Sequence, residues 1–84
     1  MTALQIGSKV KVKQKFWTSD NPIPQGTITK KFQLRPLLDG NAPITERQFE
    51  CALRDADVCE YGYFVVWDHN NCENPWSEIE LELA

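Results

Sequence analysis

The residues of this chain that could do acid-base or nucleophilic chemistry are few and scattered. His69 is the only histidine, so any catalytic triad must include it. Cys59 or Cys72 would then be the nucleophile, and Asp68 would orient the imidazole ring. Asp68 and His69 are adjacent, however, and adjacent residues of a strand point to opposite faces, which makes an orienting contact awkward. We therefore interpret His69 as a turn residue.

Carboxylates and phosphate-binding loops are the other sources of chemistry to consider. Glu78, Glu80 and Glu82 alternate near residue 84 and could lie close together, but a strand there offers no obvious pocket. The four glycines stand singly, so there is no Gly-rich phosphate loop. We expect a protein that is not an enzyme and has no catalytic residues.

Four residues of the kinds that bind zinc are present, namely Cys51, Cys59, His69 and Cys72. Structural zinc sites usually carry two cysteines separated by two to four residues, whereas seven residues separate the first pair here. We therefore expect semi-buried reduced thiols and a surface histidine, with no metal and no cofactor.

The cysteine count and the apolar runs also bear on location. Three cysteines make a poor disulfide framework for a secreted protein, and the N-terminus lacks the charged-then-apolar pattern of a signal peptide. The longest apolar run, residues 63–67, is far shorter than the roughly 20 residues that span a bilayer. These features predict a cytoplasmic protein without a membrane segment.

The size and composition are those of one small folded unit. The chain has 84 residues, of which 42% are apolar and 25% are charged, so disorder of the whole chain is not expected. There is room for one domain, residues 1–84, with one modest core. This composition predicts that the chain folds on its own.

Lysines stand at every second position of the stretch KVKVKQKF, which begins at Lys9. Because side chains of a strand alternate between faces, a strand here would put the lysines on a wet face and Val10 and Val12 in a core. A row of lysines can also bind phosphates, which gives an alternative function for the chain, a nucleic-acid-binding barrel. Its candidate residues are Lys9, Lys11, Lys13, Lys15, Lys30 and Lys31.

The stretch SEIELEL repeats the same alternation with the opposite charge. If the two terminal strands lie side by side, glutamates face lysines, and each opposite pair contributes about 0.2 to 1 kcal/mol. The lysines would then fix the pairing of the chain ends rather than bind phosphates. Six lysines and one acid precede residue 32, whereas three arginines and eleven acids follow, and the net charge is −3.

Alternating apolar and polar residues predict strands over residues 9–16 and 77–83. β-Branched and aromatic residues predict strands over residues 26–32 and 60–68. Pro22 and Pro24 lie in a loop after the first strand, and residues 35–43 form a turn-rich excursion.

Residues 45–56 support two interpretations. As a helix, Thr45 and Gln48 would form a capping box, and an apolar face would contain Phe49, Ala52, Leu53 and Ala56. As a strand, one face would contain Phe49, Cys51 and Leu53, and the other would contain Glu50, Ala52 and Arg54. The strand is slightly favoured, because the acidic residues that follow could then turn it into a hairpin.

Short strands, a long loop after the first one, a tryptophan-rich sheet and paired termini describe a small, strongly bent barrel. The order of IGSKVKV, Phe16-Trp17, the loop, GTIT, YFVVWD and SEIELEL resembles the Src-homology-3-like barrels over about half of the chain. Among these it is similar to the small barrel protein of the photosystem I reaction centre, the variable chain of ferredoxin-thioredoxin reductase and the barrel domain of the nitrile hydratase β chain.

That resemblance implies an all-β fold, an SH3-like barrel of four to five strands whose middle excursion can hold a short helix. It also implies an accessory scaffold that docks onto a larger protein through its loops. Residues 33–59 are longer and more acidic than in the photosynthetic barrels, which argues against electron transfer.

Aromatic side chains give the best indication of a binding surface. Trp17 and Trp76 stand beside the two proline-containing loops, and Tyr61 begins an aromatic strand. Tryptophan and tyrosine near loops commonly anchor protein interfaces. We therefore expect a non-catalytic module that binds another protein through Trp17, Trp76 and Tyr61. A partner with a basic surface would suit the acidic second half of the chain.

Overall fold

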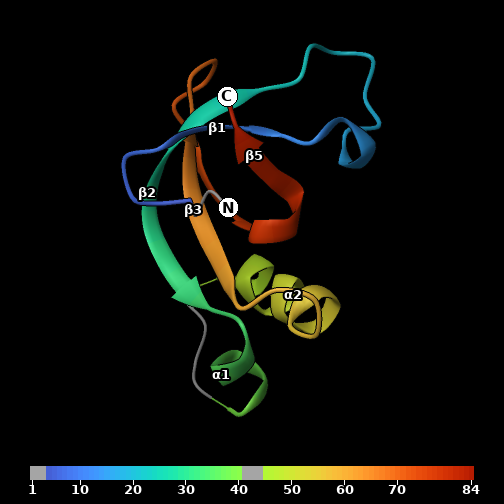
Figure 1. Cartoon of the computed structure of the whole chain (residues 1–84), viewed down its shortest axis with the longest axis vertical. Coiled ribbons are helices and arrows are strands. Elements are labelled where there is room, and N and C mark those ends of the chain that lie inside the picture. Colours follow the sequence, from blue (N-terminus) through green and yellow to red (C-terminus); the bar gives the residue numbers. More distant parts are fainter. Residues whose placement is uncertain (1–3, 41–44) are drawn as a thin grey trace.

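A five-stranded antiparallel sheet dominates the computed structural model, which describes residues 4–40 and 45–84 (Figure 1). The strands in the described ranges are β1 (Lys9–Val12), β2 (Gln25–Gln33), β3 (Tyr61–Trp67), β4 (Glu73–Ser77) and β5 (Leu81–Leu83). They lie in the order β4-β3-β2-β1-β5, so the first and last strands are neighbours. The expectation of a mostly β domain with paired terminal strands is confirmed.

The sheet is open rather than closed into the expected barrel. Within residues 4–40 and 45–84, no ladder joins β4 to β5 at the two edges. The residues between these strands form a 3-10 turn, η2 (Glu78–Glu80), in place of further strand. The side chains of Ser77 and Glu80 bond to each other across this turn, at 3.0 Å between Oγ and Oε1. This turn also corrects the prediction of a continuous strand over residues 77–83.

The pairing of β1 with β5 brings one lysine opposite one glutamate. Lys11 faces Glu82 in the register, and 4.0 Å separates Nζ from Oε1. Lys9 instead contacts the carboxylate of Asp68 at the end of β3. The prediction that a row of lysines faces a row of glutamates therefore holds for one pair of residues in β1 and β5.

The first strand is shorter than predicted, because it ends at Val12 rather than at Phe16. The chain then forms a 3-10 turn, η1 (Gln14–Phe16), in which Phe16 N donates to Lys13 O at 3.0 Å. Lys15 lies in this turn. The alternation of lysines in the sequence therefore continues beyond the end of the strand.

The strand β4 occupies a stretch for which Pro75 predicts a loop. Proline cannot donate a ladder hydrogen bond and is confined mainly to edge strands. Here β4 is an edge, and Pro75 sits opposite Phe64 of β3. Asn71, with φ of 55°, occupies the left-handed conformation in the turn between the two strands.

Residues 46–55 form a helix, α2 (Glu46–Asp55), so the slight preference for a strand was wrong. The capping box of the helical alternative is present: Gln48 N donates to Thr45 Oγ1 at 3.3 Å, and Thr45 N donates to Gln48 Oε1 at 3.0 Å. The local cap outweighs the alternation of apolar residues, because it satisfies backbone donors that a helix start leaves free.

The buried face of α2 agrees with the predicted one at Ala52 and Ala56 only. The helix buries Gln48, Cys51, Ala52 and Asp55, whereas Phe49 and Leu53 are exposed. A second helix, α1 (Arg35–Leu38), packs against α2. It lies in the expected turn-rich excursion, of which residues 41–43 are outside the described ranges. In these ranges no helix is long and apolar enough to cross a membrane.

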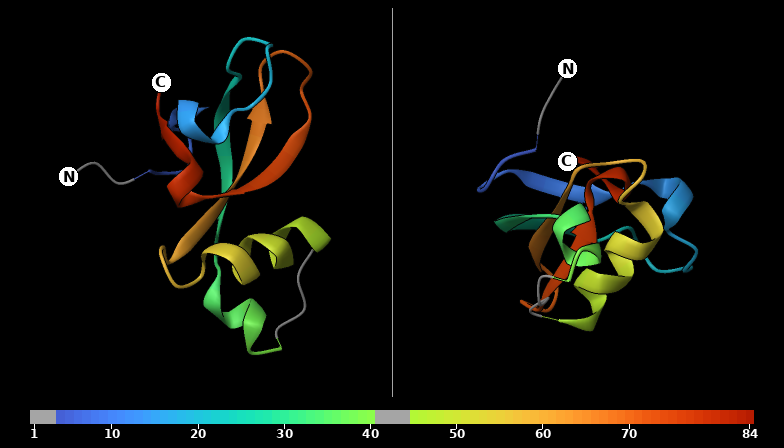
Figure 2. Two further views of the ribbon diagram at one scale, coloured as in Figure 1. Left: turned by 90° about the vertical axis from the view of Figure 1, so that its right-hand side faces the viewer. Right: turned by 90° about the horizontal axis from the view of Figure 1, so that it is seen from below.

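Two apolar clusters correspond to the two ends of the molecule. The cluster under the sheet consists of Leu4, Val10, Val12, Ile28, Tyr63, Val65, Trp67 and Leu81. The cluster between the helices consists of Leu34, Leu37, Cys51 and Ala52. As Figures 1 and 2 show, α2 lies between the sheet and α1, while β2 and β3 extend along the molecule toward both clusters.

Candidate functional site

Trp17 and Trp76 line two adjoining hollows, which we call the tryptophan hollows. Their volumes are about 400 Å³ and about 180 Å³, and both are lined by Trp17, Pro24 and His69. The larger one also contacts Asn21, Pro22, Ile23, Gln25 and Asp68. The smaller one also contacts Trp67, Asn70, Asn74 and Trp76. The loop after η1 and the turn between β3 and β4 thus meet around two of the three predicted aromatic residues.

Trp17 is held by the loop that follows it. Its indole Nε1 donates to Asn21 O at 2.8 Å, and Asn21 N donates to Ser19 Oγ at 3.1 Å. Ile23 packs against the cluster under the sheet, which anchors the loop from its other side. These contacts tie the loop to the Trp17 ring and to the core beside the hollows.

Trp76 is held by aromatic and cationic neighbours. Its ring lies edge-to-face with Trp67, at 5.6 Å between centroids and 83° between planes. The Arg47 guanidinium of α2 lies 5.5 Å from the centroid of the Trp76 ring. The buried Nε1 of Trp76 has no hydrogen-bond acceptor among residues 4–40 and 45–84. An unsatisfied buried donor costs about 1–3 kcal/mol, so the position of this ring is set by packing.

Tyr61 does not share the tryptophan hollows. It begins β3 opposite Gln33, and Lys31 Nζ lies 3.8 Å from the centroid of its ring. Sequence reasoning missed His69 and Pro24 as hollow-lining residues, because only the pairing of β3 with β4 brings the turn toward the loop. The proline-containing loop beside Trp17 was the available indication.

The six lysines of the nucleic-acid alternative do not form one free row. Lys9, Lys11 and Lys30 contact the carboxylates of Asp68, Glu82 and Glu73 respectively. Lys15 lies over the ring of Phe16 and Lys31 over that of Tyr61. Lys13 borders a hollow that Glu78 and Glu82 also line. Acids therefore pair with three of the six lysines, which weakens the argument for one continuous phosphate-binding row.

The residues considered for catalysis do not assemble. Asp68 contacts Lys9 rather than orienting His69, and Cys59 lies with the helical end of the molecule. Burial raises the pKa of the Cys51 thiol to about 11, and burial also raises the pKa of Cys59. Protonated thiols are poor nucleophiles. No group of three His, Cys, Asp or Glu residues in the described part of the chain is arranged to hold a metal ion.

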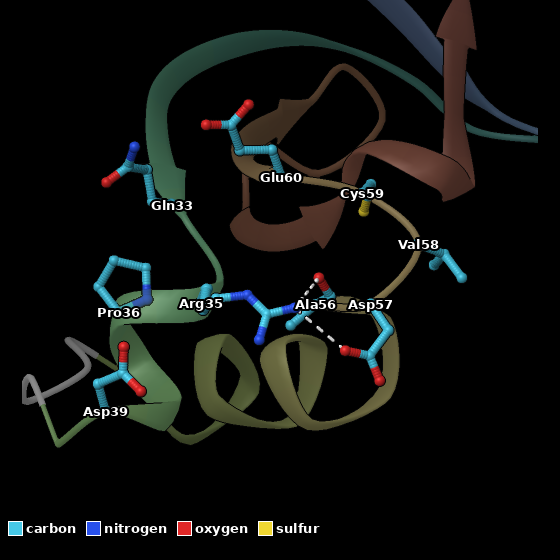
Figure 3. Close-up of a pocket in the computed structure, with 9 residues that line it drawn as sticks. All are labelled: Gln33, Arg35, Pro36, Asp39, Ala56, Asp57, Val58, Cys59 and Glu60. Atoms are coloured by element: carbon cyan, nitrogen blue, oxygen red, sulfur yellow. Dashed lines mark hydrogen bonds and ion pairs between the residues drawn. The ribbon is translucent and has the colours of Figure 1, made fainter.

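A wider hollow of about 640 Å³ lies between β2, α1 and the segment after α2 (Figure 3). Arg35 Nη2 donates to Asp57 Oδ1 at 3.1 Å and to Ala56 O at 3.4 Å across its floor. Asp39, Glu60 and Cys59 also line it. Both members of the Arg35–Asp57 pair are mainly solvent-exposed, so the hollow presents no desolvated charge that would define a ligand.

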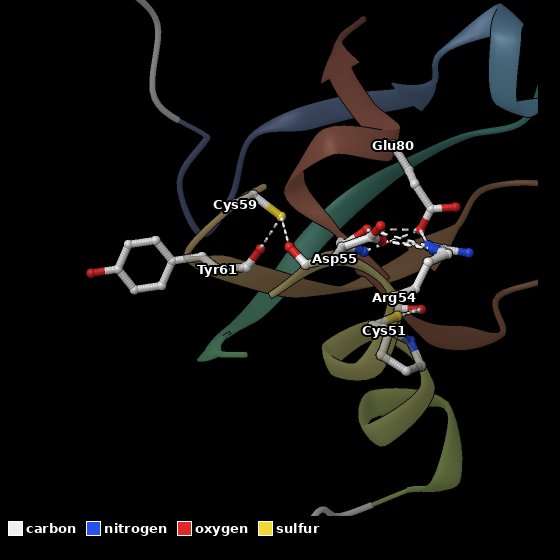
Figure 4. Close-up of polar contacts among 8 residues, drawn as sticks. Cys51, Arg54, Asp55, Cys59, Tyr61 and Glu80 are labelled. Atoms are coloured by element: carbon white, nitrogen blue, oxygen red, sulfur yellow. Dashed lines mark hydrogen bonds and ion pairs between the residues drawn. The ribbon is translucent and has the colours of Figure 1, made fainter. Parts of the chain in front are cut away.

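A buried polar cluster joins α2 to the turn η2 (Figure 4). Asp55, Ser77 and Glu80 are buried, and Ser77 Oγ lies 2.5 Å from Asp55 Oδ2 and 3.0 Å from Glu80 Oε1. The Arg54 guanidinium lies 2.7 Å from Asp55 Oδ2 and 2.5 Å from Glu80 Oε1. The two carboxylates thus share one hydroxyl and one cation. Because no hollow opens onto them among those described, we assign the cluster a structural role.

No protein-family model, curated protein or solved structure matches the chain.

Proposed function

We propose that the protein is a non-catalytic binding module that docks onto another protein through the tryptophan hollows. The observation that carries this proposal is the meeting of Trp17, Trp76 and Pro24 around hollows beside a loop that accepts a hydrogen bond from the Trp17 indole. Aromatic side chains supply contact area at low entropic cost, and pockets beside them fit alternate side chains of an extended peptide.

The chemistry of the hollows favours an extended segment with apolar side chains as the ligand. Their walls combine indole rings and proline with the polar side chains of Asn74, His69 and Gln25. Apolar walls with a few polar groups are typical of sites that anchor side chains and orient a backbone.

We further propose that this module is related in architecture to the SH3-like barrels. The proposal is supported by the five antiparallel strands, the adjacent first and last strands and the long loop after β1. The open edges at β4 and β5 distinguish this chain from a closed barrel.

The test of this function compares variants of the hollows in binding a captured partner. A protein retained from a cell lysate by the wild type would be purified and titrated against Trp17→Ala and Trp76→Phe. Trp76→Phe keeps an aromatic ring beside Trp67 and avoids the larger cavity that alanine would leave. We expect affinity to fall about tenfold or more for Trp17→Ala, as for other aromatic anchors.

The matched control is Tyr61→Ala, which removes an aromatic ring outside the hollows. Its affinity should stay within about twofold of the wild type. If Trp17→Ala binds as well as the wild type while circular dichroism shows both folded, the hollows are not the docking site.

A parallel titration with single-stranded RNA and double-stranded DNA tests the lysines, because binding that weakens steeply with salt would favour the nucleic-acid alternative.

A further inference from the structure

The outer face of α2 exposes the most apolar side chains of the helix. Phe49 and Leu53 lie one turn apart and are 38% and 63% exposed. The helix meanwhile buries the polar side chains of Gln48 and Asp55. The helix also buries Cys51 and Ala52 in the cluster between the helices, so its inner face is partly apolar. Phe49 and Leu53 are not needed for that packing and remain available on the outer side.

The same face carries negative charge that no neighbour balances. Glu46 and Glu50 stand with Phe49 and Leu53 at helix positions i, i+3, i+4 and i+7, which lie on one side of a helix. Neither glutamate is within ion-pair distance of a cation in the described ranges. We call Glu46, Phe49, Glu50 and Leu53 the acidic strip.

The arginines of α2 are engaged elsewhere and do not cancel this charge. Arg47 lies over the Trp76 ring, and Arg54 bonds to Asp55 and Glu80 on the inner side of the helix. Between residues 35 and 60 the chain has six acids and three arginines. The surroundings of the strip therefore have a net negative charge, which attracts a cationic partner.

We propose that the acidic strip is a docking site for a basic amphipathic helix of a partner protein. The strip spans about 10 Å, which is seven residues at a rise of about 1.5 Å each, and this length fits two turns of a single helix. Apolar residues of that helix pack on Phe49 and Leu53, and its lysines or arginines reach Glu46 and Glu50. A second copy of this chain would instead place two acidic strips against each other, and their like charges would repel.

This docking site is independent of the tryptophan hollows. Neither Phe49 nor Leu53 lines either hollow. Trp17→Ala should therefore leave binding at the strip unchanged, so that failure of one proposal is distinguishable from failure of the other.

The test uses a synthetic helix-forming peptide of about fourteen residues, built from leucine and lysine with leucines at i, i+3, i+4 and i+7. It is titrated into isotope-labelled protein at low salt and followed by NMR. We expect the amide shifts to concentrate on residues 46–54. Leu53→Ala should weaken binding about tenfold, and Glu46→Gln combined with Glu50→Gln should reduce its salt dependence.

The chain offers matched controls for both variants. Leu83→Ala removes an exposed leucine of β5, and Asp20→Asn removes a loop carboxylate; both should leave the peptide affinity within about twofold. A peptide with glutamate in place of lysine should not bind. Equal weakening by Leu53→Ala and Leu83→Ala, or shifts spread over all acidic surfaces, would overturn the proposal. The proposal would also be overturned if sedimentation showed that the wild type is a dimer and that Leu53→Ala is a monomer. The occupant of the strip would then be a second copy of this chain.

Discussion

The buried polar cluster between α2 and η2 makes the sharpest prediction about stability. The carboxylates of Asp55 and Glu80 are 7% and 6% exposed, and Arg54 is the one cation that contacts both in the described part of the chain. Its hydrogen bond to Asp55 raises the pKa of Arg54 above an already high value, so the guanidinium stays charged. The substitution Arg54→Met keeps an aliphatic side chain and removes this charge.

The expected loss follows from leaving two neighbouring carboxylates without a cation. Removing one member of a buried ion pair typically costs about 3–5 kcal/mol. The Arg54 side chain is 57% exposed, so water screens part of its interaction, and we expect a loss of about 2–3 kcal/mol. That is a large fraction of the roughly 4–13 kcal/mol expected for a domain of 84 residues.

The assay is urea unfolding followed by tryptophan fluorescence, with Arg35→Met as the matched control. Arg35 pairs with Asp57 at 3.1 Å, but both side chains are mainly exposed, so its loss should cost about 0–1 kcal/mol.

Glu80→Gln in the Arg54→Met background removes the second carboxylate and should recover part of the lost free energy of unfolding. If Arg54→Met were no less stable than Arg35→Met, or if the double variant recovered nothing, the two carboxylates would not depend on the guanidinium. The attribution of stability to this cluster would then be wrong.

Three further predictions concern single side chains. Gly26→Ala should lower the free energy of unfolding by about 1–3 kcal/mol in urea, because its Cβ would lie 2.5 Å from the carbonyl oxygen of Val66 in β3. Gly62→Ala should cost less, because its Cβ would meet the ring of Phe32, which can move. Iodoacetamide at neutral pH should modify exposed Cys72 well before buried Cys51, whose pKa burial raises to about 11; equal rates would contradict the buried position. Burial raises the pKa of Tyr63 from about 10 to about 12, so its contribution to stability is complete below pH 10 and is lost as pH rises toward 12. Tyr63→Phe should flatten this decline of the free energy of unfolding. An unchanged decline would contradict the assignment to Tyr63.

Local patterns predicted the elements whose alternation or capping agrees with their tertiary surroundings. The β-branched and aromatic run over residues 60–68 is β3, and the stretch around Ile28 is β2. Thr45 and Gln48 form the capping box that the helical interpretation required. Opposite charges on alternating positions predicted that lysines of the first strand face glutamates of the last, and Lys11 does face Glu82.

Other features depended on contacts that sequence spacing does not reveal. Pro75 argued for a loop, but β4 is an edge strand where a missing donor costs little. The alternation of SEIELEL argued for a strand, but Glu80 turns inward to Arg54 and Ser77, and the chain coils into η2. Of the apolar face expected on α2, Ala52 and Ala56 do pack against the cluster between the helices, whereas Phe49 and Leu53 are exposed. The contact of Asp55 with Ser77 in the buried polar cluster contributes to this orientation of the helix.

The sequence by itself determined a small, mostly β domain with paired terminal strands and an aromatic loop region. Alternation, capping and turn chemistry are local, and they act within a few residues of the chain. Only the tertiary structure decided that Trp17 and Trp76 meet while Tyr61 lies elsewhere, and that α2 presents Phe49 and Leu53 to solvent. Those outcomes depend on which distant groups share a buried space, where packing and the pairing of charges outweigh local preference.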